Sequence, residues 1–238
     1  MHLFYTPTIE PHYREFILNE DESKHAIRVL RLGAGDEIYL IDGVGGWYTA
    51  NILDAHPKRT TLSIRHVEQG YKKPTYYLHV AIAPTKNMDR MEWFLEKATE
   101  IGIQEITPVI SDHSERKDVK LERLNKVVVS AMKQSLKAYL PKINPTISLR
   151  QFFEQIKREE YTTQTIAHCA EGQKQYLADI CSPAGKYLVL IGPEGDFSEN
   201  EIAQALSLGY LPVSLGNSRL RTETAALTSC VEIALLNR

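Results

Sequence analysis

Residues 191–197 form a loop that could bind a ligand through its backbone. The loop reads Ile-Gly-Pro-Glu-Gly-Asp-Phe and directly follows a short apolar run at 187–191. Two glycines allow the backbone to approach a ligand closely, and the proline stiffens the turn. The same residues are equally typical of a tight turn between a strand and a helix. Taken alone, the loop leaves both interpretations open.

A second loop, residues 215–225, carries Arg219 and Arg221 beside the expected start of a helix. Thr222 is a suitable N-cap, and the free amides of a helix N-terminus bind anions. Glu223 suits the first turn of a helix for electrostatic reasons alone. Arginine, however, offers a planar fork that matches carboxylate or phosphate. The pair of arginines therefore favours a binding or catalytic function over a purely structural one.

The segment 113–142 is strongly basic, with eight Lys or Arg residues and three acidic residues. We expect a helix over 119–139, in which the apolar side chains share one face at 100° per residue. The opposite face gathers four cations, Arg123, Lys126, Lys133 and Lys137. Such a face is either simply solvated or a footprint for a phosphate backbone. Residues 25–31 add a second basic segment with the same ambiguity.

Several common chemistries are not supported by the sequence. It contains no G-x-G-x-x-G, G-x-x-x-x-G-K-[ST], G-x-S-x-G or H-E-x-x-H motif, so dinucleotide, phosphate-loop, nucleophile-elbow and zinc-protease sites are not expected. The histidines lack metal-ligand spacing, and we expect no metal site. Cys169, Cys181 and Cys230 show no C-x-x-C spacing, so we expect buried free thiols of a cytoplasmic protein. No apolar run is long enough to cross a bilayer, and no secretory signal is visible.

Length and composition fit a globular protein of one large domain or two smaller ones. The chain has 238 residues, 43% of them hydrophobic, and a formal net charge of −2. Short β-rich runs at 37–41, 47–53 and 60–67 predict a small antiparallel, barrel-like domain over residues 1–72. A linker around Pro74 ends this pattern.

Residues 73–238 alternate strand and helix patterns. The expected strands are 76–83, 106–110, 165–169, 187–191 and 211–215, and the expected helices are 87–101, 119–139, 198–208 and 222–237. Ser198 and Glu201 fit a capping box. This alternation predicts an α/β domain with a mostly parallel sheet and helices on both faces. Ligands of such sheets bind beyond the carboxyl ends of the strands, where both loops described above lie.

The motifs together resemble one known family. They comprise residues 86–102, 191–195, 215–216 and 220–225, with His25, Val29-Leu30-Arg31 and Gly35-Asp36. In this order they resemble the bacterial ribosomal small subunit methyltransferase E family, SPOUT-class enzymes that methylate N3 of a uridine in 16S rRNA. The resemblance covers nearly the whole chain.

The resemblance implies a fold and partners. The C-terminal domain, 73–238, is expected to be a SPOUT parallel-sheet domain with a trefoil knot, an exception to the usual unknotted topology. The N-terminal domain, 1–72, is expected to be a small PUA-like β-barrel that helps to hold RNA. A cytoplasmic homodimer acting on 16S rRNA in the small ribosomal subunit is implied, with no membrane and no metal.

The resemblance also implies the site residues. S-adenosyl-L-methionine is expected to contact Ile191, Gly192, Pro193, Gly195, Leu215, Gly216, Asn217, Leu220, Thr222, Thr224 and Ala225. Arg221 is expected to stabilise negative charge on the uracil or to orient it, and Glu223 or Glu194 to accept a hydrogen bond or proton. The RNA-binding residues are expected to be His25, Arg28, Arg31, Lys86, Arg90, Arg123, Lys126, Lys133 and Lys137.

Two positions depart from the family pattern. Asp196 stands where many members have a second glycine, and Ser218-Arg219 replaces a frequent Arg-Ile order. The first departure affects the geometry of the loop, and the second affects the role of Arg219.

Three alternative functions stay open: methylation of a ribose 2′-hydroxyl of tRNA or rRNA, RNA binding by an assembly factor without cofactor, and a small-molecule α/β enzyme.

Overall fold

The computed structural model describes all 238 residues, which divide into two compact units. The first unit comprises Met1–Lys73 and Met132–Leu140, and the second comprises Pro74–Ala131 and Pro141–Arg238. The segment Met132–Leu140 belongs to the first unit because Met132 packs with Ile41 and Trp47. The sequence pattern places this segment in the second domain instead.

The first unit is built on a five-stranded sheet of order β1-β3-β4-β5-β2. Its strands are β1 (Leu3–Tyr5), β2 (Glu15–Ile17), β3 (Glu37–Ile41), β4 (Gly46–Asp54) and β5 (Thr61–Gln69). The pairs among β3, β4, β5 and β2 are antiparallel, as expected. The β1–β3 pair is parallel, so the expectation of a wholly antiparallel sheet is wrong at this edge. A long connection through β2 and a helix joins these two strands, and a parallel pair requires such a crossover.

Between β2 and β3 lies a short helical segment that the sequence patterns did not predict. Helix α1 (Glu20–Lys24) is capped by Asn19 and continues into the π-helical turn η1 (His25–Val29). Arg31 follows with a φ of 59°, an uncommon conformation for a residue with a side chain. Buried Ala26 anchors η1 to the core of the unit, so His25 and Arg28 can project into solvent.

The second unit contains an all-parallel sheet of order β11-β13-β10-β12-β6-β7-β8, with β9 also paired to β7. Its strands are β6 (Tyr77–Ile82), β7 (Glu105–Ile110), β8 (Lys142–Ile143), β9 (Ile147–Ser148), β10 (Thr163–Ala167), β11 (Gln175–Tyr176), β12 (Lys186–Ile191) and β13 (Leu211–Ser214). The central strands read as continuous apolar runs because both faces of the sheet are covered. The prediction of a parallel α/β domain is confirmed.

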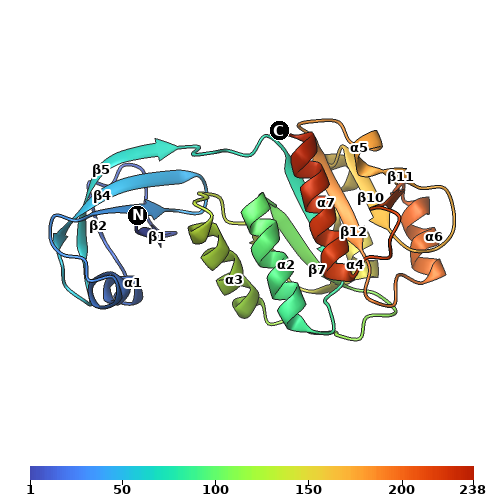
Figure 1. Cartoon of the computed structure of the whole chain (residues 1–238), viewed down its shortest axis with the longest axis horizontal. Coiled ribbons are helices and arrows are strands. Elements are labelled where there is room, and N and C mark those ends of the chain that lie inside the picture. Colours follow the sequence, from blue (N-terminus) through green and yellow to red (C-terminus); the bar gives the residue numbers. More distant parts are fainter. The chain divides into compact units, whose positions relative to one another are not determined.

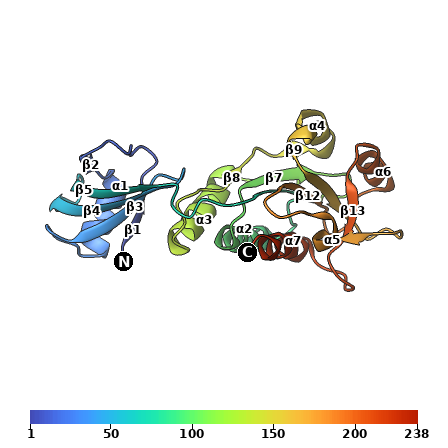
Figure 2. The same cartoon turned by 90° about the horizontal axis from the view of Figure 1, so that it is seen from above.

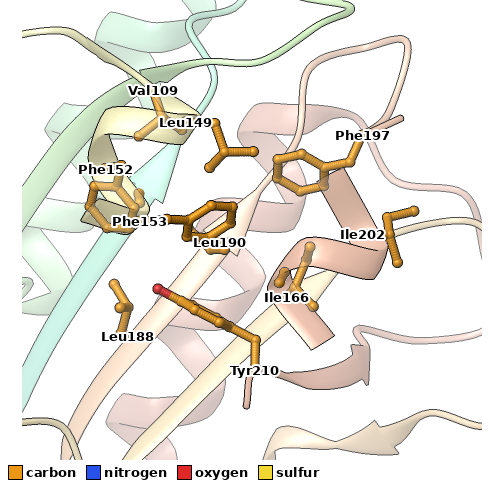
Figure 3. Close-up of a cluster of buried hydrophobic side chains, with 12 residues drawn as sticks. Val109, Leu149, Phe152, Phe153, Ile166, Leu188, Leu190, Phe197, Ile202 and Tyr210 are labelled. Carbon is orange, nitrogen blue, oxygen red and sulfur yellow. The ribbon is translucent and has the colours of Figure 1, made fainter. Parts of the chain in front are cut away.

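Helices cover both faces of this sheet. Helices α2 (Met88–Ile101) and α7 (Thr222–Leu236) lie side by side on one face (Figure 1). Helices α4 (Leu149–Gln155) and α6 (Glu199–Ser207) lie on the other (Figure 2). The short α5 (Leu177–Ile180) packs against α7. The core beneath α4 and α6 joins aromatic rings such as Phe152 and Tyr210 to the aliphatic side chains of the strands (Figure 3).

Local signals set several helix boundaries. Ser198 and Glu201 form the expected capping box at the start of α6. Helix α3 (Leu121–Gln134) is shorter than the expected 119–139. The chain leaves the helix at Leu136, which has a φ of 54°, so Lys137 lies outside it. None of the helices combines the length and the apolar character that crossing a bilayer requires.

Candidate functional site

A cavity of about 910 Å³ lies beyond the carboxyl ends of β10, β12 and β13. Ala167 at the end of β10 pairs with Ile191 of β12 and with Val213 of β13. The three strands therefore end level with one another, and their loops meet at one edge of the sheet. This is the edge at which parallel α/β sheets bind ligands.

Most residues expected to contact a cofactor line this cavity. They are Ile191, Gly192, Pro193, Leu215, Gly216, Asn217, Leu220, Thr222 and Ala225. Gly195 and Thr224 are not in its lining. Instead, the carbonyl oxygen of Gly195 lies 3.1 Å from Nδ1 of His113. This contact, outside the cavity lining, helps to position the loop.

The two loops predicted from the sequence are tied to each other. The hydroxyl of Thr222 donates a hydrogen bond to the carbonyl of Gly192, at 3.1 Å. Helix α7 begins at Thr222, and its N-cap residue is Arg221. The expectation that Thr222 is the N-cap is therefore wrong by one residue. A Cβ on Gly192 would lie 3.1 Å from the ring of Phe197. Glycine at this position therefore lets the loop fold tightly onto its own Phe197, which precedes α6.

The three candidate catalytic residues lie in different surroundings. Glu194 and Arg221 are exposed and line the cavity. A carboxylate oxygen of Glu194 accepts a hydrogen bond of 3.0 Å from the backbone amide of Lys86. Glu223 is buried and lies outside the cavity lining, with Oε1 3.9 Å from Nε of Arg90 and Oε2 without a partner. The cavity therefore brings Glu194 and Arg221 to the same site but not Glu223.

The loop after β10 adds residues that the sequence patterns did not single out, chiefly His168, Cys169 and Lys174. Their position directly after an apolar strand was the available signal. Cys169 is exposed, so the expectation of three buried thiols is wrong for this residue. Its amide donates a hydrogen bond of 2.7 Å to Asp196 Oδ2. Asp196 adopts a φ of 64°, the region that glycine favours, and this bond shows what its side chain does in place of a glycine.

His168 has the least satisfied side chain of the cavity wall. Both ring nitrogens are buried from solvent, and neither has a hydrogen-bond partner. Burial and the nearby charge of Lys174 lower the pKa of His168, which opposes protonation. A neutral imidazole offers one donor and one acceptor, so a polar ligand in the cavity would satisfy it.

The candidate RNA-binding residues of the first unit differ in exposure and in whether an acidic residue pairs with them. His25, Arg28 and Arg31 are exposed on or just after η1. Lys133 pairs with Glu22 at 3.1 Å. Burial and Lys72 lower the pKa of Lys137. The basic face expected around 119–139 is therefore not a uniform row of free cations.

The candidates of the second unit are also partly neutralised. Lys86 pairs with Glu115 at 2.8 Å, and Arg123 pairs with both Glu92 and Asp89. The acids that pair with Arg123 and Lys133 come from other parts of the chain, so the two charges are not free although the helix face itself is basic. Lys126 is exposed and forms no ion pair.

Both parts of the chain match known protein families. Residues 72–234 match the model of the RNA methyltransferase domain, and residues 18–65 match that of the RNA methyltransferase PUA domain. The ribosomal RNA small subunit methyltransferase E of Rickettsia conorii is 30% identical over 226 residues, which span 92% of this chain and 89% of the relative.

Two solved structures are similar over the full chain. A probable rRNA-methyltransferase from Porphyromonas gingivalis is 43% identical, with a TM-score of 0.91 over 100% of this chain and 98% of the other. The ribosomal RNA small subunit methyltransferase E from Neisseria gonorrhoeae, bound to S-adenosyl methionine, is 29% identical, with a TM-score of 0.89 over the same shares.

Proposed function

The chain belongs to the ribosomal RNA small subunit methyltransferase E family, and we propose that it methylates N3 of one uridine in 16S rRNA of the small ribosomal subunit. It is an S-adenosylmethionine-dependent rRNA methyltransferase. The observation that carries the proposal is the cavity at the carboxyl ends of β10, β12 and β13, which is lined by both loops and by Glu194 and Arg221, one from each loop.

The residues present fit S-adenosylmethionine. The ring nitrogens of His168 at the cavity wall have no partner within the protein, so a polar ligand would satisfy them. We assign cofactor binding to the lining loops 191–194 and 215–222, together with Ala225. Gly195 and Thr224 stay in the proposal as residues that shape these loops. The bound cofactor supplies a reactive sulfonium methyl group.

The protein must orient the uracil ring and help N3 to lose its proton. Arg221 is exposed at the cavity, and its guanidinium stabilises negative charge that develops on the uracil. Glu194 is held by the amide of Lys86 and can accept the N3 proton or a hydrogen bond from the base. Glu223 is the weaker candidate for this function because it lies outside the cavity lining.

The RNA must reach the cavity with its target base unstacked, because the edge of a stacked base is inaccessible to the methyl donor. We propose that His25, Arg28 and Arg31 of the first unit contact rRNA phosphates. In the second unit, Lys126 is proposed to do the same, as is Arg90, whose Nε lies 3.9 Å from a carboxylate oxygen of Glu223. Lys86, Arg123, Lys133 and Lys137 are proposed contacts whose acidic partners or burial reduce their contribution.

We also propose that the protein is a homodimer of the cytoplasm, where ribosomal subunits are found. Helix α7 carries apolar side chains around its whole circumference, which is typical of a helix buried on all sides. In the single chain, Val231 and Leu235 of α7 and Trp93 of the adjacent α2 are exposed. A second copy covering this face would bury them. Light scattering of purified protein checks this, and Val231→Asp is expected to yield monomers.

The test of the proposed activity uses small ribosomal subunits that lack the modification. Purified protein and S-adenosylmethionine labelled in the methyl group are incubated with these subunits, and labelled nucleosides are separated by chromatography. Label in N3-methyluridine is the expected result. Label in a 2′-O-methylated nucleoside would overturn the assignment of N3, and absence of label would overturn the assignment of substrate.

A further inference from the structure

A second cavity, of about 890 Å³, lies near the start of α2 and the segment that leads into α3. Five of its lining residues are basic, Lys86, Arg116, Lys117, Lys120 and Arg123, and two are acidic, Glu115 and Asp118. We refer to it as the basic cavity. Arg116, Lys117 and Lys120 are not among the residues assigned to RNA above.

The cations of the basic cavity fall into two groups. Lys86 and Arg123 are engaged by carboxylates, Glu115 for Lys86 and Glu92 for Arg123. Lys117 and Lys120 are exposed and make no ion pair, so their charge is not locally neutralised. The lining has five basic and two acidic residues, so positive charge is in excess, and Lys117 and Lys120 present it to solvent.

One residue connects the basic cavity to the cofactor cavity. The backbone amide of Lys86 donates to Glu194, at 3.0 Å. The carbonyl oxygen of the same residue accepts two hydrogen bonds from the guanidinium of Arg116, at 3.0 and 3.3 Å. Lys86 thus lies between a cation of the basic cavity and a candidate catalytic carboxylate, and a ligand on Arg116 can act on the Glu194 contact through Lys86.

We propose that the basic cavity binds backbone phosphates of the rRNA next to the target nucleotide. This inference rests on the proposed function and extends it to residues 116, 117 and 120. A polyanion suits the cavity because Lys117 and Lys120 offer free charges and Arg116 offers a guanidinium fork. Phosphate held there keeps Arg116 and Lys86 in place and thereby orients Glu194 toward the base.

The test compares two double variants of the full-length chain with the same change in charge. Lys117→Glu/Lys120→Glu alters the basic cavity. Arg150→Glu/Lys157→Glu is the matched control, because Arg150 belongs to α4, on the other face of the sheet from α2, and Lys157 follows α4 in the chain. Both variants replace exposed side chains, so thermal melting is expected to match that of the wild type.

The readouts are binding to unmodified small subunits over a range of salt concentrations, the KM for subunits and the Kd for S-adenosylmethionine. In the basic-cavity variant, the KM is expected to rise about tenfold or more and the slope of log K against log salt to fall by about two, since about one unit is lost per phosphate contact. The Kd for S-adenosylmethionine is expected to stay unchanged. The control is expected to keep the wild-type slope and KM.

A third variant, Arg116→Gln, tests the link through Lys86. It is expected to lower kcat several-fold in addition to raising the KM, whereas Lys117→Glu/Lys120→Glu mainly raises the KM. Equal losses in both double variants would show a general charge effect and overturn the proposal, as would an unchanged salt slope. If the wild type transfers no methyl group, the proposed function fails, yet the salt slopes still decide whether the basic cavity binds RNA.

Discussion

His79 and His168 lie in or directly after strands of the same parallel sheet, and they differ in the hydrogen bonds that their ring nitrogens make. His79 lies within β6, and its ring nitrogens hydrogen-bond with Thr107, at 2.7 Å, and with Tyr161, at 2.8 Å. His168 directly follows β10, and its ring nitrogens have no partner. Burial lowers the pKa of both, to about 4 for His79. Burial thus favours the neutral form of both rings, which differ in their hydrogen-bond partners.

His79 belongs to a network of polar side chains that hydrogen-bond with one another. Its neighbour Glu105 accepts hydrogen bonds from Tyr77, Lys142 and Asn144. Burial by itself raises the pKa of Glu105, but the charge of a protonated His79 and these hydrogen bonds hold it at about 2. The carboxylate thus stays ionised, and the network joins β6, β7 and β8.

Structural and functional polar groups in this molecule therefore differ in where their hydrogen-bond partners come from. A buried polar group that finds its partners within the protein stabilises the fold. A buried group left without partners at the carboxyl ends of the strands is available to a ligand. We therefore expect changes at the network of His79 to alter stability, and changes at the cavity to alter cofactor binding or catalysis.

The largest effect is expected for Arg221→Ala on the cavity side. Loss of the guanidinium is expected to lower kcat by about 10²–10³, the usual cost of removing one donor to a developing negative charge. Unfolding by urea is expected to be unchanged, because Arg221 is exposed and its side chain makes no capping hydrogen bond. Single-turnover methyl transfer measures the effect. A large loss of stability would contradict the assignment of Arg221 to function.

On the network side, His79→Leu is expected to lower the free energy of unfolding by about 2–3 kcal/mol. The substitution leaves the half-buried Tyr161 hydroxyl without its partner and removes one of the two partners of the buried Thr107 hydroxyl, which still accepts from Asn144. Urea denaturation provides the measurement, and His79→Gln is the control that retains polar atoms. The Kd for S-adenosylmethionine of the folded variant is expected to match that of the wild type. A weakened Kd would contradict the assignment of His79 to structure.

The pH dependence of stability provides a second test of the structural function of His79. Folded His79 has a pKa of about 4, below its ordinary value of 6.5, so the unfolded chain binds the proton more readily. The contribution of His79 is complete above pH 6.5 and is lost as the pH falls toward 4. Glu105 adds a further loss as the pH falls from 4.5 toward 2. In His79→Leu the fall between pH 6.5 and 4 is expected to be smaller, as denaturation at several pH values would show.

His168→Leu is expected to have the opposite profile to His79→Leu. The Kd for S-adenosylmethionine is expected to rise about tenfold, equivalent to about 1.4 kcal/mol. Stability is expected to be unchanged or slightly higher, because no protein hydrogen bond is lost. Calorimetric titration with the cofactor checks the first expectation, and His168→Asn serves as the polar control. An unchanged Kd would remove His168 from the cofactor site.

The smallest effect is expected for Thr222→Val, at the junction of the two loops. Its hydroxyl bond to the carbonyl of Gly192 is a neutral one, so its loss is expected to cost about 1 kcal/mol of stability. The Kd for S-adenosylmethionine is expected to rise only a few-fold, because the loop carrying Gly192 loosens. Thr222→Ser keeps the hydroxyl and is expected to restore both values. A failure of Ser to do so would place the function of Thr222 in its methyl group.

Local signals were sufficient where a short stretch of chain sets its own conformation. The capping box at Ser198, the helix start after Asn87 and the apolar strands β6 and β12 could be predicted because nearby residues satisfy one another. Strands β8 and β9 were not predicted, because they consist of two residues each and exist only through pairing with β7. Helix α4 was also missed, although Ser148 and Gln151 form a capping box and so provided a local signal. The end of α3 also escaped prediction, since Met132 and Ala138 pack against β3 and β4 residues distant in sequence.

The sequence by itself determined the glycine loop, the arginines before α7 and the order of motifs that identifies the family. Only the tertiary structure decided that Glu194 lines the cavity while Glu223 does not, that Arg123 and Lys133 are neutralised, and that His168 lacks a partner. The physical reason is that a loop conformation depends on neighbouring residues. The partners of a charge or an imidazole depend instead on which distant strands and helices the fold brings within hydrogen-bond distance.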